Sequence, residues 1–214
     1  MTPYYQDELV TIWHGDCRDL LPSIEADVIV TDPPYGIGAT YRAHGGSGGD
    51  VLAWDAEYPH SVINEAVTRG PVVSFGAAQM IARELAAFEV TPRLAIWAPS
   101  FRLGMSAKDH MAYRYTPVYL WGVAPKEGTV RDVFTEPTEA GNWWVHPASK
   151  PVRLMIALCA LTSGTILDPF MGSGTTLVAA KSLNRHAIGI EIDERYCEIA
   201  ATRCSQGVLG LEMA

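Results

Sequence analysis

Residues 165–180 limit the folds open to this chain more than any other segment. A short apolar run ends at Asp168, a turn that contains Gly172 and Gly174 follows, and residues 175–183 have the composition of a helix. Glycine adopts the positive φ angles of a tight turn and lets a ligand approach the backbone, and free N–H groups at a helix start favour a negatively charged group. The segment therefore predicts a strand, turn and helix that bind a nucleotide-like ligand, as at the first βα turn of a doubly wound sheet.

Two common phosphate-binding turns are excluded by the residues present. A P-loop requires a lysine directly after the second glycine, where this chain has Thr175. A dinucleotide fingerprint requires a third glycine three residues after the second, where this chain has Leu177. Glu191 ends the next apolar run, residues 187–190, and an acidic residue there suits the two hydroxyls of a ribose. A nucleoside with a short, weakly anionic tail, such as S-adenosyl-L-methionine (SAM), fits better than a di- or triphosphate.

A second motif, Asp32-Pro33-Pro34-Tyr35, lies near the amino terminus. It follows residues 26–31, an almost continuous β-branched run that is typical of a buried parallel strand. Two consecutive prolines end the strand and hold the backbone extended. As an isolated tetrapeptide this would be an ordinary turn. Because ligands of open α/β sheets bind beyond the carboxyl ends of the strands, its place after a buried strand predicts that Asp32 and Tyr35 border a binding crevice.

Strand and helix signals alternate along the rest of the chain. We expect strands at residues 9–13, 26–31, 71–75, 93–97, 115–122, 130–134, 166–167 and 187–190, and helices at residues 18–24, 61–69, 77–87, 151–161, 175–183 and 194–203. This rhythm predicts an α/β fold with a doubly wound, mostly parallel sheet. Residues 115–122 and 130–134 are expected to be antiparallel, which would form an antiparallel hairpin at one edge.

Composition favours one soluble domain. The chain has 214 residues, 48% of them hydrophobic, which is enough for one sizeable core, so we expect a single domain over residues 1–214. It has no apolar run of about 18 residues and no basic leader, so we expect a cytoplasmic protein without a membrane segment. The four cysteines lack Cys-x-x-Cys spacing, which indicates neither a zinc site nor a disulfide framework.

The formal net charge of −8 argues against nucleic-acid binding, because phosphate contacts need Lys and Arg. The charges are unevenly spread, however. Residues 91–153 contain eight basic and five acidic side chains, a net +3, so the remainder carries −11. A basic middle segment is compatible with DNA binding and, equally, with ordinary solvated surface charge.

Taken together, Asp32-Pro33-Pro34-Tyr35 and residues 168–176 resemble the DNA amino-methyltransferases, which methylate the exocyclic nitrogen of adenine or cytosine. The catalytic motif comes first and the cofactor motif last, as in the permuted β class, and the resemblance covers nearly the whole chain. Shorter pieces agree with it: Gly15-Asp16-Cys17, His146-Pro147, Lys150-Pro151 and residues 188–193. The resemblance implies a Rossmann-like SAM-dependent methyltransferase sheet, SAM as cofactor, DNA as partner and a role in DNA methylation, including restriction–modification.

The resemblance also implies roles for single residues. The catalytic turn would be Asp32, Pro33, Pro34 and Tyr35, with the Asp32 carboxylate and the Pro33 carbonyl accepting the amine hydrogens and Tyr35 stacking on a flipped base. Cofactor contacts would come from Asp16 and Cys17 near the adenine, Lys150 at the methionine carboxylate, Glu191 on the ribose, and Asp168, Phe170, Gly172, Ser173, Gly174 and Thr175 at the turn.

Two segments between the motifs are expected to serve DNA. The glycine-rich residues 36–50 would form a lid over the flipped base. Residues 99–149 would be a short target-recognition insertion, in which Trp143 and Trp144 stack on bases, and its length implies short or relaxed sequence recognition. Small members of the resembled class often dimerise, so a homodimer is also expected.

Alternatives remain at this point. In the resembled family Asp is the commoner residue at position 32 for adenine and Ser for cytosine, which favours adenine N6 over cytosine N4. An RNA methyltransferase would share the cofactor half, a protein-glutamine methyltransferase usually has Asn at position 32, and a non-catalytic SAM-binding subunit is the non-enzyme alternative. Carbon-5 methylation of cytosine would need a cysteine nucleophile, usually after a proline, and none of the four cysteines follows a proline.

Overall fold

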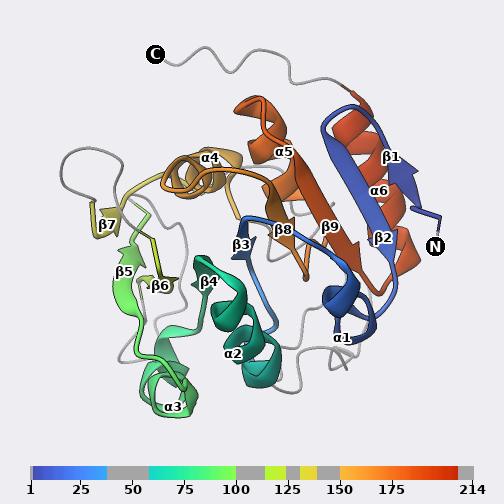
Figure 1. Cartoon of the computed structure of the whole chain (residues 1–214). Helices are drawn as coiled ribbons and strands as arrows, with labels where there is room; N and C mark the ends of the chain where they lie inside the picture. Colours follow the sequence, from blue (N-terminus) through green and yellow to red (C-terminus); the bar gives the residue numbers. More distant parts are fainter. Residues whose placement is uncertain (1, 38–57, 100–113, 124–130, 139–149, 207–214) are drawn as a thin grey trace, which may run out of the picture.

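The computed structural model describes residues 2–37, 58–99, 114–123, 131–138 and 150–206. Within this part of the chain one nine-stranded sheet forms in the order β1-β2-β9-β8-β3-β4-β6-β5-β7 (Figure 1). The strands are β1 (Tyr5–Gln6), β2 (Val10–His14), β3 (Val28–Thr31), β4 (Val72–Phe75), β5 (Arg93–Trp97), β6 (Thr116–Trp121), β7 (Val133–Phe134), β8 (Ile166–Asp168) and β9 (Ala187–Glu191).

The helices alternate with the strands as predicted. They are α1 (Cys17–Leu20), α2 (His60–Arg69), α3 (Ile81–Ala87), α4 (Val152–Ala160), α5 (Thr175–Ser182) and α6 (Glu194–Ser205), with the short 3-10 helices η1 (Leu21–Ser23) and η3 (Ala78–Met80). Most lie within two residues of the expected bounds, and the expected helix at residues 77–87 is divided between η3 and α3. None of the helices in the described ranges is long and apolar enough to span a bilayer.

The predicted α/β fold with a mostly parallel, doubly wound sheet is confirmed. Strands β2, β9, β8, β3 and β4 pair in parallel, while β1 at one edge is antiparallel to β2. The expected antiparallel strand at residues 115–122 is confirmed, whereas residues 130–134 do not form a second antiparallel strand. β6 is antiparallel to both β4 and β5 and lies between them, and β7, at the edge, is parallel to β5.

Burial explains the place of β6. Its last five residues, Pro117 to Trp121, are all buried, so both faces of the strand need a cover. A strand inside the sheet lies under the layers on both faces and has both rows of backbone groups paired, whereas an edge strand exposes one row. The antiparallel neighbours of β6 are accordingly β4 on one side and β5 on the other.

Two hydrophobic cores lie on opposite faces of the sheet. Val28 and Val30 of β3 pack with residues of α4, α5 and α6, whereas Ile29 packs with α1, η1 and α2. Successive side chains of a pleated strand point to opposite faces, so neighbouring residues of β3 belong to different cores. The helices accordingly form a layer on each side of the sheet (Figure 1).

The sheet order brings the two sequence motifs together. β3, which ends at the Asp32 turn, pairs in parallel with β8, which ends at the glycine turn. Parallel neighbours end at the same edge of a sheet, so the two turns emerge side by side at the carboxyl edge.

Candidate active-site cleft

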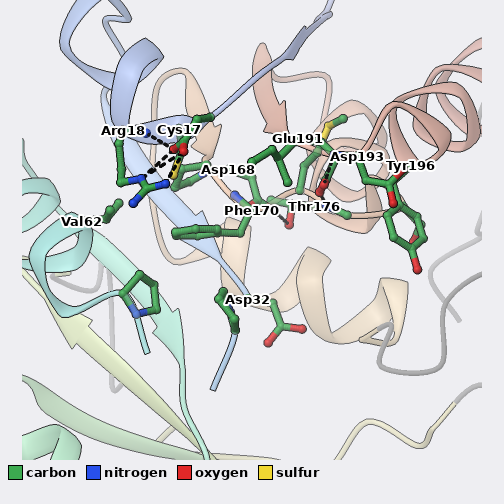
Figure 2. A pocket seen from close by; sticks show the side chains of 18 of the residues that line it. Cys17, Arg18, Asp32, Val62, Asp168, Phe170, Thr176, Glu191, Asp193 and Tyr196 are labelled. Carbon is green, nitrogen blue, oxygen red and sulfur yellow. Dashed lines mark hydrogen bonds and ion pairs between the residues drawn. The ribbon is translucent and has the colours of Figure 1, made fainter. Parts of the chain in front are cut away.

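A cleft of about 600 Å³ lies at this carboxyl edge (Figure 2). Asp32 and Pro34 of the first motif line it together with Gly172 and Ser173 of the second, so the two motifs share one cleft. Its volume is in the range of small-molecule sites. In Figure 2, Cys17, Arg18 and Val62 lie at one end of the cleft and Glu191, Asp193 and Tyr196 at the other, with Phe170 between them.

The turn between β8 and α5 has the backbone that its glycines predict. Gly172 has φ of +50° and Gly174 has φ of +79°. A Cβ atom at Gly174 would lie 2.8 Å from the Cβ of Ala200, so this glycine lets α5 pack closely on α6. A Cβ atom at Gly172 would meet nothing within 4 Å. Gly172 therefore leaves its backbone open to a ligand, while Gly174 serves the packing of the turn.

Asp168 borders the cleft, but its carboxylate is turned toward donors of the protein. It is 1% exposed. Its Oδ1 accepts hydrogen bonds from the Thr31 hydroxyl at 2.6 Å and the Phe170 N–H at 3.1 Å, and its Oδ2 accepts one from the Thr176 hydroxyl at 2.5 Å. Burial raises the pKa of Asp168 to about 6, although these hydrogen bonds oppose the shift. Both carboxylate oxygens thus stabilise the junction of β3, β8 and α5, and the expected contact with a cofactor stays a prediction.

Glu191 closes the glycine turn from the neighbouring strand. Its Oε2 accepts a hydrogen bond from the Gly172 N–H at 2.9 Å, and its Oε1 accepts one from the Asp193 N–H at 2.8 Å. Burial raises the pKa of Glu191, and the backbone hydrogen bonds lower it in part. Each carboxylate oxygen keeps a further lone pair, so Glu191 can still accept hydrogen bonds from ligand hydroxyls.

Asp16 and Cys17 begin α1 at the other end of the cleft. The Asp16 carboxylate caps the helix by accepting the Arg18 N–H at 2.9 Å and forms an ion pair with the Arg18 guanidinium, which lowers the pKa of Asp16. Cys17 is buried, and burial raises the pKa of its thiol to about 11. The Cys17 thiol that lines the cleft is therefore protonated and uncharged at neutral pH.

Arg203 of α6 holds the glycine turn from outside the motif. Its Nη1 donates to the Ser173 carbonyl at 2.6 Å, the Ser173 hydroxyl at 3.0 Å and the Thr175 hydroxyl at 3.2 Å. Ser173 and Thr175 are both buried. Arg203 could not be identified from the sequence, because nothing in the composition of α6 shows which of its basic residues faces the turn.

The first motif forms a compact group with Lys150. The Lys150 ammonium lies 2.6 Å from Asp32 Oδ2 and 2.8 Å from the Tyr35 hydroxyl oxygen, and the Tyr35 hydroxyl donates to Asp32 Oδ1 at 2.5 Å. Pro33 is buried and Pro34 lines the cleft. Lys150 was expected at the carboxylate of a cofactor. The structure places its ammonium on Asp32 and Tyr35, and SAM binding by a Lys150 variant distinguishes this pairing from the expected cofactor contact.

A further wall of the cleft was not identified from the sequence. It consists of the first residues of α2 and those before it: Tyr58, Pro59, His60, Ser61 and Val62. Tyr58 is buried, and its hydroxyl lies 3.1 Å from the Ser74 hydroxyl of β4, which anchors the wall to the sheet. Neither a motif nor a glycine pattern marks this segment, so its place could not be inferred locally.

Several predicted features lie outside the described residues. These are His146, Trp143, Trp144 and the expected lid except for residues 36–37. The expected insertion at residues 99–149 is described only at residues 99, 114–123 and 131–138.

This chain is similar in sequence to known DNA methyltransferases and similar in fold to solved structures of such enzymes. The model of the N6/N4 DNA methylase family matches residues 100–202. The type II methyltransferase M.ScaI of Streptomyces caespitosus is 27% identical over 259 residues, which cover 94% of this chain and 83% of that protein. Among solved structures, the M1.HpyAVI–SAM complex has a TM-score of 0.63 at 23% identity and covers 91% of this chain and 100% of that one. The cytosine-N4-specific PvuII DNA methyltransferase has a TM-score of 0.69 at 17% identity, covering 99% and 90%. At these identities the two structures show a shared fold.

Proposed function

We propose that this chain, which its sequence similarity identifies as a SAM-dependent DNA methyltransferase, transfers the methyl group to the exocyclic N6 of adenine. The similarity to DNA methylases and type II methyltransferases confirms the resemblance that the two motifs predict. One observation carries the proposal: Asp32 and the glycine turn line the same cleft. An acceptor for an amine and a nucleoside-binding turn are therefore within reach of each other.

The cleft fits SAM, the cofactor of this enzyme. Gly172 faces open space, so its backbone can contact a ligand closely. Glu191 retains lone pairs for ribose hydroxyls. SAM supplies an electrophilic methyl group when bound. We propose that the residues holding it are Asp16 and Cys17 at the adenine, Glu191 at the ribose, and Asp168, Phe170, Gly172, Ser173 and Thr175 at the turn, with Gly174 keeping the turn in shape.

Asp32 is proposed to activate the amine. The lone pair of an exocyclic amine is delocalised into the base ring, which makes the nitrogen a poor nucleophile. A carboxylate that accepts one amine hydrogen, with the Pro33 carbonyl accepting the other, favours a pyramidal nitrogen with a localised lone pair. The Asp32 anion also stabilises the positive charge that develops on this nitrogen, and a fixed acceptor needs no reorganisation during the reaction.

The target base must leave the duplex to reach Asp32. Flipping a base out costs a few kcal/mol of stacking and pairing, of which an aromatic surface recovers part. Tyr35 is proposed to be this surface, and Pro34 lines the cleft beside Asp32. Adenine is favoured over cytosine because Asp, and not Ser, occupies position 32 in the motif that resembles the family.

We also propose one domain over residues 1–214, with a target-recognition insertion at about 99–149. β6 and β7 come from this span and belong to the main sheet. The span has only about fifty residues in all, part of them strand, which favours short or relaxed sequence recognition. A homodimer would enlarge the surface that contacts DNA.

Nucleoside analysis tests the proposed reaction. Unmethylated genomic DNA is incubated with the protein and methyl-tritiated SAM, digested to nucleosides and separated, and we expect the label in N6-methyl-2′-deoxyadenosine. A matched control is a duplex of guanine and cytosine only, which should accept no label. Label in N4-methyl-2′-deoxycytidine would show that the target base is cytosine and not adenine. If RNA offered as substrate accepts label and DNA does not, the proposal is contradicted.

A further inference from the structure

We propose that Lys150 is a positioning residue that holds the Asp32 carboxylate and the Tyr35 hydroxyl in the orientation that the amine substrate requires. This inference rests on the proposed function of the cleft and adds a residue from the opposite half of the chain to the catalytic turn.

Three hydrogen bonds form a closed cycle at this place. Lys150 donates to Asp32 Oδ2 at 2.6 Å and to the Tyr35 hydroxyl at 2.8 Å, and that hydroxyl donates to Asp32 Oδ1 at 2.5 Å. Each oxygen of Asp32 therefore has a separate donor. Because two donors define the plane of a carboxylate, the cycle sets the rotation of Asp32 as well as its position.

The surroundings of Lys150 make the cycle rigid. Its side chain is 8% exposed, and its ammonium lies 5.2 Å from the centre of the Tyr35 ring and 4.9 Å from that of Phe75. A buried ammonium is stable only with an anion or comparable partners, so Asp32 and the two rings hold it in place. The backbone of Lys150 is also restricted, because Pro151 follows it.

The cycle leaves Asp32 able to accept the substrate. A carboxylate offers about four lone-pair sites, and Lys150 and Tyr35 occupy two of them. The Asp32 side chain remains 25% exposed and lines the cleft. The sites that remain can accept an amine hydrogen, while the ammonium keeps the carboxylate from rotating away.

Three variants test this role. Lys150→Met keeps the length of the side chain but removes the charge and the donors, whereas Lys150→Arg keeps both. Lys181→Met is the matched control, because Lys181 forms another part-buried pair, with Asp7 at 2.5 Å, away from the cleft. For each variant kcat and KM for DNA are measured together with the dissociation constant for SAM by calorimetry.

We expect Lys150→Met to lower kcat by about a hundredfold, since a displacement of about 1 Å at a reacting group has an effect of this size. The dissociation constant for SAM should stay unchanged, Lys150→Arg should regain part of kcat, and Lys181→Met should keep kcat. A Lys150→Met protein with wild-type kcat, or one with weaker SAM binding and unaltered kcat, would overturn the positioning role. Failure of the wild type to methylate DNA would instead refute the proposed function.

Discussion

The hydroxyl of Thr31 donates a hydrogen bond to Asp168 across 2.6 Å, and this bond joins the last residue of β3 to the last residue of β8. The Asp32 turn begins directly after Thr31, and the glycine turn begins directly after Asp168. The two halves of the cleft are therefore connected through one buried carboxylate as well as through the backbone of the sheet.

The raised pKa of Asp168, about 6, predicts a pH-dependent contribution to stability. Between its ordinary pKa and 6 the folded protein binds this proton more tightly than the unfolded chain does. The contribution is therefore fully present at low pH and is lost as the pH rises through 6. We expect the difference in unfolding free energy between the wild type and Asp168→Asn to fall by roughly 1 kcal/mol from pH 5 to pH 7.5.

Urea denaturation of both proteins at several pH values measures this difference, in which the other titrating groups cancel. Thr31→Val is a useful companion, since it removes one hydroxyl donor and leaves the carboxylate buried. A difference that is independent of pH, or that increases with pH, would show that the pKa of Asp168 is not raised in the folded protein.

Asp32→Ala should lower methyl transfer by about two to three orders of magnitude, the usual effect of removing one preorganised polar group from an active site. SAM binding should remain, because Asp32 belongs to the part of the cleft assigned to the base. Since alanine would leave the Lys150 ammonium buried without its anion, Asp32→Asn serves as the control that keeps the shape of the side chain. Wild-type activity in Asp32→Ala would end the assignment of Asp32.

Glu191→Ala should weaken SAM binding by about 10- to 100-fold, the range for hydrogen bonds to a charged group. The variant also releases the Gly172 N–H, which loosens the turn. Calorimetric titration with SAM measures the effect. Glu194→Ala removes the same charge nearby but lies outside the cleft lining, and its dissociation constant should be close to that of the wild type. Equal constants for the two variants would refute the ribose contact.

The two glycines of the turn should respond differently to alanine. Gly174→Ala combines a left-handed backbone with a contact of 2.8 Å to Ala200, so we expect a loss of about 2–4 kcal/mol of stability. Gly172→Ala has only the backbone strain, about 1 kcal/mol, but places a methyl group in the cleft. Thermal denaturation should rank Gly174→Ala as less stable, and calorimetry should show weaker SAM binding for Gly172→Ala. The reverse ranking would contradict the roles assigned to the two glycines.

Much of the fold was predictable because its signals are local. The buried run before Asp32, the glycines of the β8–α5 turn and the periodicity of α5 and α6 depend on neighbours within a few residues, and all of these elements form where they were expected. The face of α6 was less clear. Cys197, Ala200 and Cys204 are its buried residues, whereas Tyr196, only one position before Cys197, lines the cleft.

The amino-acid sequence by itself determined the strand and helix order, the two motifs and, by resemblance, the reaction class. Only the tertiary structure decided that β6 enters the sheet between β4 and β5, that Lys150 pairs with Asp32, and that Arg203 holds the Ser173 turn. Local patterns record which residues favour a strand, a turn or a buried face. They do not record strand order, and strand order sets which residues, far apart in the chain, become partners in the cleft.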